Sequence, residues 1–268
     1  MDYVSNFAVA VYETFTPEPV SPLFKAGGFF EGYNEELIFI TLGIIFLGIL
    51  DVCIVMPFFK TKARYFALHT AANAIIAIAA WPDVVRVFTD HPDRAYTGPY
   101  NSALPNAMAA SIHLYHCIAF KLRGEDIFHH LVFVLSLCPL AVPFKQNAGA
   151  SACMAGFFAT GLPGGINYLM LVLKIHDLIS KDFEKKCYTF INIVIRAPGL
   201  ICYVFIYWYA YRAGHRPAPI IVPLFAGALH YYNGTMYAAQ AAESEAKYFF
   251  NKKHGIVPKR AKKDDDDE

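Results

Sequence analysis

Seven long apolar stretches constrain the fold of this chain more than any other feature. A helix needs about 20 mostly apolar residues to cross a membrane, and the candidates are 37–59, 65–81, 103–120, 127–144, 150–173, 188–211 and 219–239. The 268 residues are 56% hydrophobic with a mean hydropathy of +0.35. A soluble core cannot hide so much apolar surface. We therefore predict an all-α, polytopic transmembrane bundle of about seven spans.

The positions of Lys and Arg predict the orientation of these spans, because basic residues near span ends accumulate on the cytoplasmic side. Sixteen of them lie on one side of the predicted membrane, in the segments 60–64, 121–123, 174–186 and 247–263. Only six lie on the other side, namely Lys25, Arg86, Arg94, Lys145, Arg212 and Arg216. This bias supports seven spans, with the N-terminus outside and the C-terminus inside.

Three regions follow from this topology. They are a non-cytoplasmic N-terminal segment (1–36), the transmembrane domain (37–240), and a charged tail facing the cytoplasm or matrix (241–268). The first residues lack a basic region before an apolar core, so we predict no signal peptide. The six cysteines form no CxxC pair or short-spaced metal pattern, and we expect them to act as small apolar core residues.

Polar side chains inside the spans are the candidate functional residues. An ionisable group at a helix centre costs roughly 3 kcal/mol or more, so it usually faces a bundle interior or a site. Most such groups lie toward the cytoplasmic ends of their spans, and partners three or four residues apart share a helix face. We predict a polar cavity open toward the cytoplasm, whose lipid-binding candidates are Asp51, His113, His116, Asn192, Arg196 and His230.

Arg196 is the most demanding of these residues, because it interrupts a long apolar run. It needs a carboxylate partner or an anionic ligand. Asp51 is the only carboxylate at a comparable depth, so we predict an Arg196–Asp51 pair or a bound lipid anion. We also predict that Arg196 and His130 face a common interior volume.

Structural roles compete with these functional ones. Polar side chains commonly hold transmembrane helices together, and this explanation is favoured for His69, Asn73, His230 and Asn233. The glycine- and proline-rich stretch 161–165 either lines a substrate path with a broken helix or packs closely against a neighbour.

A recognisable motif surrounds the double histidine. The run SIHLYHCIAFKLRGEDIFHHLVFVLSLCPL resembles the core of the TLC-domain proteins, a lipid-handling membrane family that includes the ceramide synthases. Tyr115 occupies the position of the family's tyrosine, and Asp126, His129 and His130 follow at the family's spacing. Two departures are Phe133, in place of the family's threonine, and Gly161, in place of its acidic residue.

The resemblance implies acyl-CoA-dependent N-acyl transfer to a long-chain base, with acyl-CoA as co-substrate and no bound cofactor or metal. His129 and His130 would act as acid and base, and Asp126 would orient one of them. Because of the two departures, the alternative is a non-catalytic TLC-like protein that binds lipid or serves as an accessory subunit of a larger membrane complex. We expect membrane lipids as partners and no nucleic acid.

Two other enzyme classes use histidines at inner helix ends. Di-iron hydroxylases need roughly eight histidines in HxxxH and HxxHH clusters, whereas this chain has only HxxH and HH. Fatty-acid elongases have an HxxHH box, and the sequence from His113 to Cys117 lacks one histidine of it. We expect an endoplasmic reticulum location, with the mitochondrial inner membrane as the alternative.

Overall fold

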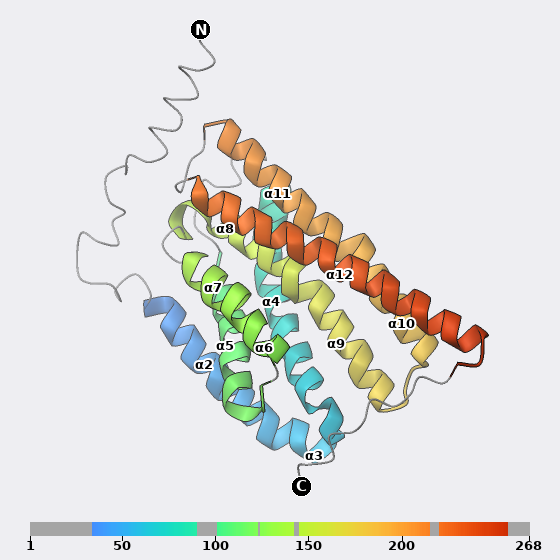
Figure 1. Ribbon diagram of the computed structural model, residues 1–268. Coiled ribbons are helices and arrows are strands. Elements are labelled where there is room, and N and C mark those ends of the chain that lie inside the picture. The colour runs from blue at the N-terminus through green and yellow to red at the C-terminus, as the bar shows by residue number, and fades with distance from the viewer. Residues whose placement is uncertain (1–33, 90–100, 123, 142–144, 215–219, 257–268) are drawn as a thin grey trace.

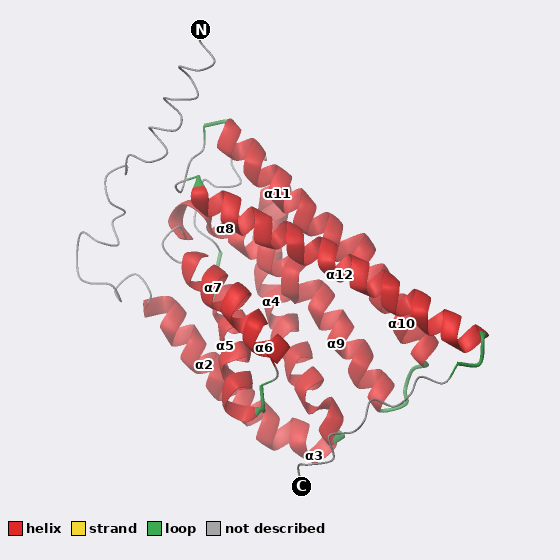
Figure 2. Cartoon of the chain, in the orientation of Figure 1, coloured by secondary structure: helices red, strands yellow, loops and turns green. Residues whose placement is uncertain are grey.

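The computed structural model describes residues 34–89, 101–122, 124–141, 145–214 and 220–256. All regular secondary structure in this part of the chain is helical, as Figure 2 shows. The described part of each predicted apolar stretch lies in a helix, so the all-α prediction is confirmed there. The predicted N-terminal segment up to residue 33 and the acidic end of the tail lie outside the described residues.

The helices run alongside one another (Figure 1). In chain order they are α2 (Asn34–Leu50), α3 (Met56–Phe58), α4 (Arg64–Thr89), α5 (Leu104–Ala119), α6 (Gly124–His129), α7 (Leu135–Ala141), α8 (Lys145–Gly156), α9 (Leu162–Ile175), α10 (Lys181–Phe190), α11 (Ala197–Arg212) and α12 (Ile221–Lys253). The α4 helix occupies the middle and contacts α5, α8 and α9, while α2 packs on α5 and α11 packs on α12.

Four pairs of consecutive helices are joined into longer helices by a π-helical turn. The turns are Asp51–Val55, His130–Val134, Phe157–Gly161 and Ile191–Arg196, and they join α2 to α3, α6 to α7, α8 to α9 and α10 to α11. A π turn adds one residue to a helical turn and is often found at functional sites. Three of the four begin or end at a predicted site residue, namely Asp51, His130 or Arg196.

Four helices of the described chain are long and apolar enough to cross a membrane: Glu35–Phe58, Thr61–Thr89, Gly149–Ile175 and Lys181–Arg212. The first of them exposes Ile38, Ile49 and Val52 to more than half of their possible area. Such a continuous apolar face is unfavourable in water and suits hydrocarbon. The chain is therefore consistent with an integral membrane protein.

Two predicted helix ends differ from the structure. The second stretch was expected to end at Trp81 before a proline, but α4 continues past Pro82 to Thr89. Buried Asp83 accepts hydrogen bonds there from the Arg86 guanidinium and the Asn101 backbone N–H. These bonds compensate for the burial of its carboxylate in the last turns of α4. The predicted boundary at residue 240 falls within α12, which extends along α10 to Lys253.

The glycine-rich stretch 161–165 packs tightly against α4. A Cβ atom at Gly161 would lie 3.1 Å from the backbone nitrogen of Ala77, and one at Gly164 would lie 2.8 Å from Nδ2 of Asn73. These glycines let α9 approach α4 closely without breaking the rod. The expectation of close packing is therefore confirmed, and the broken helix is not found. Gly164 also lines the cavity described next, and a substrate path there stays a prediction.

Candidate functional site

A polar chamber of about 280 Å³ lies inside the bundle. It is lined from α4 by His69 and Asn73, from α5 by His113, and from the π turn Ile191–Arg196 by Arg196. The remaining polar lining residues are Tyr65, Asp126, His129, Thr160, Tyr168, Asn233 and Tyr237. Groups distant in the sequence therefore meet in the half of the bundle that contains the first half of α4.

An apolar chamber of about 160 Å³ adjoins the polar one. Half of its lining residues are Ala, Val, Leu or Tyr, including Leu137, Leu229, Tyr203 and Tyr207. The two chambers share the lining residues Ala109, His113, His129, Ala159, Thr160 and Asn233. The pair thus offers a polar compartment next to an apolar one, which matches the two ends of an amphiphile.

Five histidines form a cluster beside the polar chamber, and we call His69, His113, His116, His129 and His130 the histidine cluster. The His113 ring centroid lies 5.0 Å from that of His129 and 4.9 Å from that of His130. The His116 ring lies 5.2 Å from that of His130. No group of three or more His, Cys, Asp or Glu in the described segments is arranged so that it could hold a metal ion.

The double histidine divides its two side chains between different surroundings. His129 lines both chambers. His130 lines neither; it is 8% exposed and its Nδ1 lies 3.4 Å from the Cys117 sulfur. The prediction that Arg196 and His130 face a common volume is therefore wrong. Of the two adjacent histidines, His129 shares the polar chamber with Arg196.

Several buried polar atoms of the polar chamber have no hydrogen-bond partner within the described chain. They are His69 Nε2, His113 Nδ1, Arg196 Nε and Asn233 Oδ1. His69 donates through Nδ1 to the Tyr65 carbonyl at 2.9 Å, so Nε2 of its neutral ring is an acceptor. Buried polar groups are normally satisfied, and these atoms could bind the polar part of a ligand.

The other predicted binding residues are distributed around this site. Asn192 is fully buried and accepts a hydrogen bond from Arg196 Nη1 at 2.7 Å, so it positions the guanidinium without lining the chamber. His230 lines the apolar chamber and donates from Nδ1 to the Ala226 carbonyl. His116 packs against the Tyr65 ring, with centroids 4.8 Å apart.

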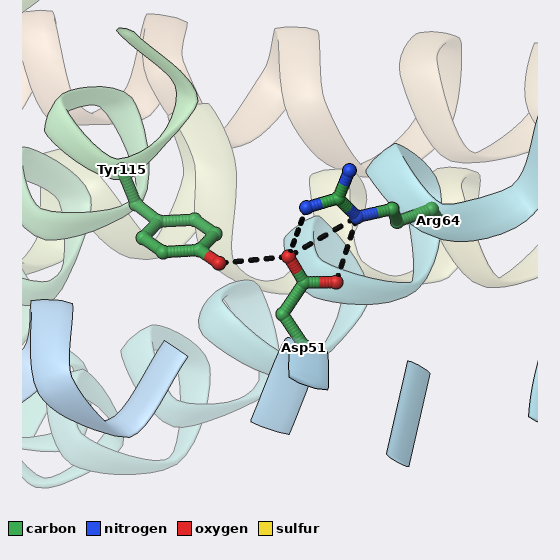
Figure 3. Close-up of polar contacts among 3 residues, drawn as sticks. All are labelled: Asp51, Arg64 and Tyr115. Atoms are coloured by element: carbon green, nitrogen blue, oxygen red, sulfur yellow. Dashed lines mark hydrogen bonds and ion pairs between the residues drawn. The ribbon is translucent and has the colours of Figure 1, made fainter. Parts of the chain in front are cut away.

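Asp51 lies outside both chambers and does not contact Arg196. Its carboxylate accepts hydrogen bonds from Arg64 Nε at 2.8 and 3.1 Å and from the Tyr115 hydroxyl at 2.7 Å (Figure 3). The predicted Arg196–Asp51 pair is therefore wrong. Arg64 is the first residue of α4, and the short turn after α3 brings it next to Asp51. Arg64 is 13 residues from Asp51 in the sequence, whereas Arg196 lies far along the chain at the end of the π turn Ile191–Arg196.

Sequence reasoning also missed the tyrosines of the polar chamber. The Arg196 guanidinium carbon lies 4.5 Å from the Tyr237 ring centroid, a cation–π geometry. The Tyr65 and His69 ring centroids lie 4.0 Å apart. A signal was present, because Tyr65 and Tyr237 each lie four residues from an intramembrane polar residue, His69 or Asn233, on one helix face. Sequence analysis favoured structural roles for those two residues, and both line the polar chamber.

Comparisons with protein-family models, with curated proteins and with solved structures found no match.

Replacing Asp51 tests the buried ion pair. Asp51→Ala leaves the Arg64 guanidinium, whose side chain is 26% exposed, without its carboxylate, and we expect a loss of about 3 kcal/mol in stability. Lys60→Ala is the matched control, because the Lys60–Asp177 pair is 52% and 85% exposed and should contribute less than about 1 kcal/mol. Thermal unfolding of the detergent-purified protein measures both. Equal melting temperatures for the two variants would contradict a structural role for Asp51.

Proposed function

We propose that this chain is an integral membrane protein that holds a lipid amphiphile inside its helical bundle. The polar part of the lipid would occupy the polar chamber and its hydrocarbon chain the apolar chamber. The observation that carries this proposal is the adjacency of the two chambers, which share His129, Thr160 and Asn233. Ligand pockets combine an apolar lining with a few placed polar groups, and this division fits a lipid.

The unpartnered polar atoms favour a ligand over simple helix–helix contacts. A polar side chain that only joins two helices finds its partner on the neighbouring helix. His69 Nε2 and Asn233 Oδ1 find none within the described chain, although both residues are at most 9% exposed. Both atoms are acceptors, so N–H or O–H donors of a head group, or of water bound with it, would satisfy them.

For the membrane arrangement we propose seven spans with a TLC-type topology. Four helices have the length and apolar composition of independent spans. The shorter α5, the rod from α6 to α7, and α12 pack among them. The asymmetry of Lys and Arg places the start of α4 and the end of α12 on the cytoplasmic side, so the polar chamber would lie toward the cytoplasm.

A second candidate is acyl-CoA-dependent N-acyl transfer to a long-chain base, and the position of His129 favours it. At the junction of the chambers, its imidazole could take the proton of an attacking amine while the acyl chain lies in the apolar chamber. Asp126 lines the same chamber. His130 lines neither chamber. It would hold the rings of His113 and His116 in place and not act on the substrate.

Filling the junction tests lipid binding. Ala159 lines both chambers, so Ala159→Trp should abolish cross-linking of a photoreactive diazirine fatty acid to chamber residues such as Tyr203. Ala239→Trp places the same bulk on the exposed face of α12 and should leave that cross-linking unchanged. Mass spectrometry of the labelled peptides gives both results. Equal labelling of Tyr203 in both variants would contradict the proposal that the lipid lies in the chambers.

The enzymatic candidate predicts a specific effect of His129. In membranes supplied with acyl-CoA and a long-chain base, His129→Ala should lower ceramide formation by about 10²- to 10⁴-fold, the usual contribution of a general base, at unchanged protein abundance. His254→Ala is the control, because this histidine is exposed just after α12, outside both chambers, and should retain full activity. Absence of ceramide formation in the unmutated protein would leave lipid binding as the function.

A further inference from the structure

Arg196 is the one arginine or lysine among the described residues that line the polar chamber. It ends the π turn Ile191–Arg196, midway along the candidate span Lys181–Arg212, and only 6% of its surface is exposed. Its Cα atom lies eight residues, about 12 Å along the helix axis, from residue 188, where the predicted apolar stretch begins, and further from the other end. An arginine side chain cannot reach water over this distance by extending toward the interface. Its charge must be met inside the bundle.

The described chain supplies polar contacts to Arg196 but no negative charge. Nη1 donates to the Asn192 side-chain oxygen, the guanidinium stacks over the Tyr237 ring, and Nε has no partner. Arg196 forms no ion pair with any carboxylate of the described residues. Asp126 lines the same chamber without pairing with it, and Asp51 is held by Arg64.

The surroundings of the guanidinium leave room for an anion. Arg196 lines the polar chamber of about 280 Å³ together with Asn73 and Gly164, so the space beside the guanidinium is that of the chamber. A guanidinium can bind two oxygens of a carboxylate or phosphate at once. An anion bound there could therefore pair with Arg196 and carry a hydrocarbon chain past Thr160 into the apolar chamber.

We propose that this site selects a single-chain lipid with a negatively charged head group, a carboxylate or a phosphate monoester, bound by Arg196. The inference rests on the proposed lipid site and adds the charge and the chain number of its ligand. The volumes of about 280 and 160 Å³ each lie below the range of about 300 to 1,000 Å³ that is usual for ligand pockets, and only together do they reach its lower part, which favours one hydrocarbon chain over two. Asn192 and Tyr237 hold the guanidinium in place before the lipid binds.

Competition with the photoreactive fatty acid in the full-length purified protein tests the charge preference. The competitors are oleate, oleyl alcohol, which has the same chain without the charge, and oleoyl lysophosphatidate. We expect oleate or lysophosphatidate to compete about tenfold better than oleyl alcohol, the factor expected for one charge-assisted hydrogen-bonded contact. The stronger of the two anions identifies the head group.

Variants of Arg196 then assign this preference to the guanidinium. In Arg196→Gln, the anion should compete no better than oleyl alcohol. The alcohol should still compete, which shows that the variant is folded. Arg196→Lys should keep part of the preference, and Arg212→Gln, on the exposed end of α11, should keep all of it. Equal binding of oleate and oleyl alcohol to the unmutated protein, or a preference that survives Arg196→Gln, would overturn the inference. Failure of every competitor would instead refute the lipid site itself.

Discussion

The free-energy cost of placing charge in hydrocarbon governs the arrangement of this bundle. Each buried ionisable group must find a compensating partner or face a polar volume. Asp51 follows the first course, because Arg64 and Tyr115 join it to α4 and α5 near the end of the bundle. Arg196 follows the second, because it faces a chamber with only neutral contacts. The same cost thus produces a structural contact at one position and a candidate binding site at the other.

The helices were predictable from sequence because apolar length is a strong signal in a membrane chain. Which side chains meet was harder to predict. The pairing of Asp51 with Arg196 was inferred from depth alone, whereas the structure pairs Asp51 with an arginine 13 residues away across a turn. Short separation along the chain outweighs equal depth, since the turn after α3 already brings the two helix ends together.

The double histidine shows a second limit of sequence reasoning. Adjacent residues on an α-helix point about 100° apart, so His129 and His130 were never equivalent candidates for one cavity. The π turn that begins at His130 adds a residue to the helical turn and so rotates the side chains that follow it around the helix axis. Such turns have no simple sequence signature, and three of the four border a residue on which the site prediction depended. The histidines and Arg196 could be named from sequence, but their division among chambers could not.

The two chambers argue for a protein that binds lipid, and they leave chemistry to one residue. His113 and His129 both line the junction of the chambers, and in the catalytic candidate His129 would do the acid–base work there. His130 packs against the rings of His113 and His116 outside the chambers. Binding and catalysis therefore share one geometry. A non-catalytic protein would use the same polar chamber to hold a head group.

An experimental structure of the protein in lipid nanodiscs tests the central claim most directly. We predict elongated density that begins within hydrogen-bonding distance of the Arg196 guanidinium, passes Thr160 and Asn233, and ends beside Tyr203 and Tyr207. Chambers filled only by ordered water, or an Arg196 guanidinium bound to a carboxylate of this chain, would contradict it.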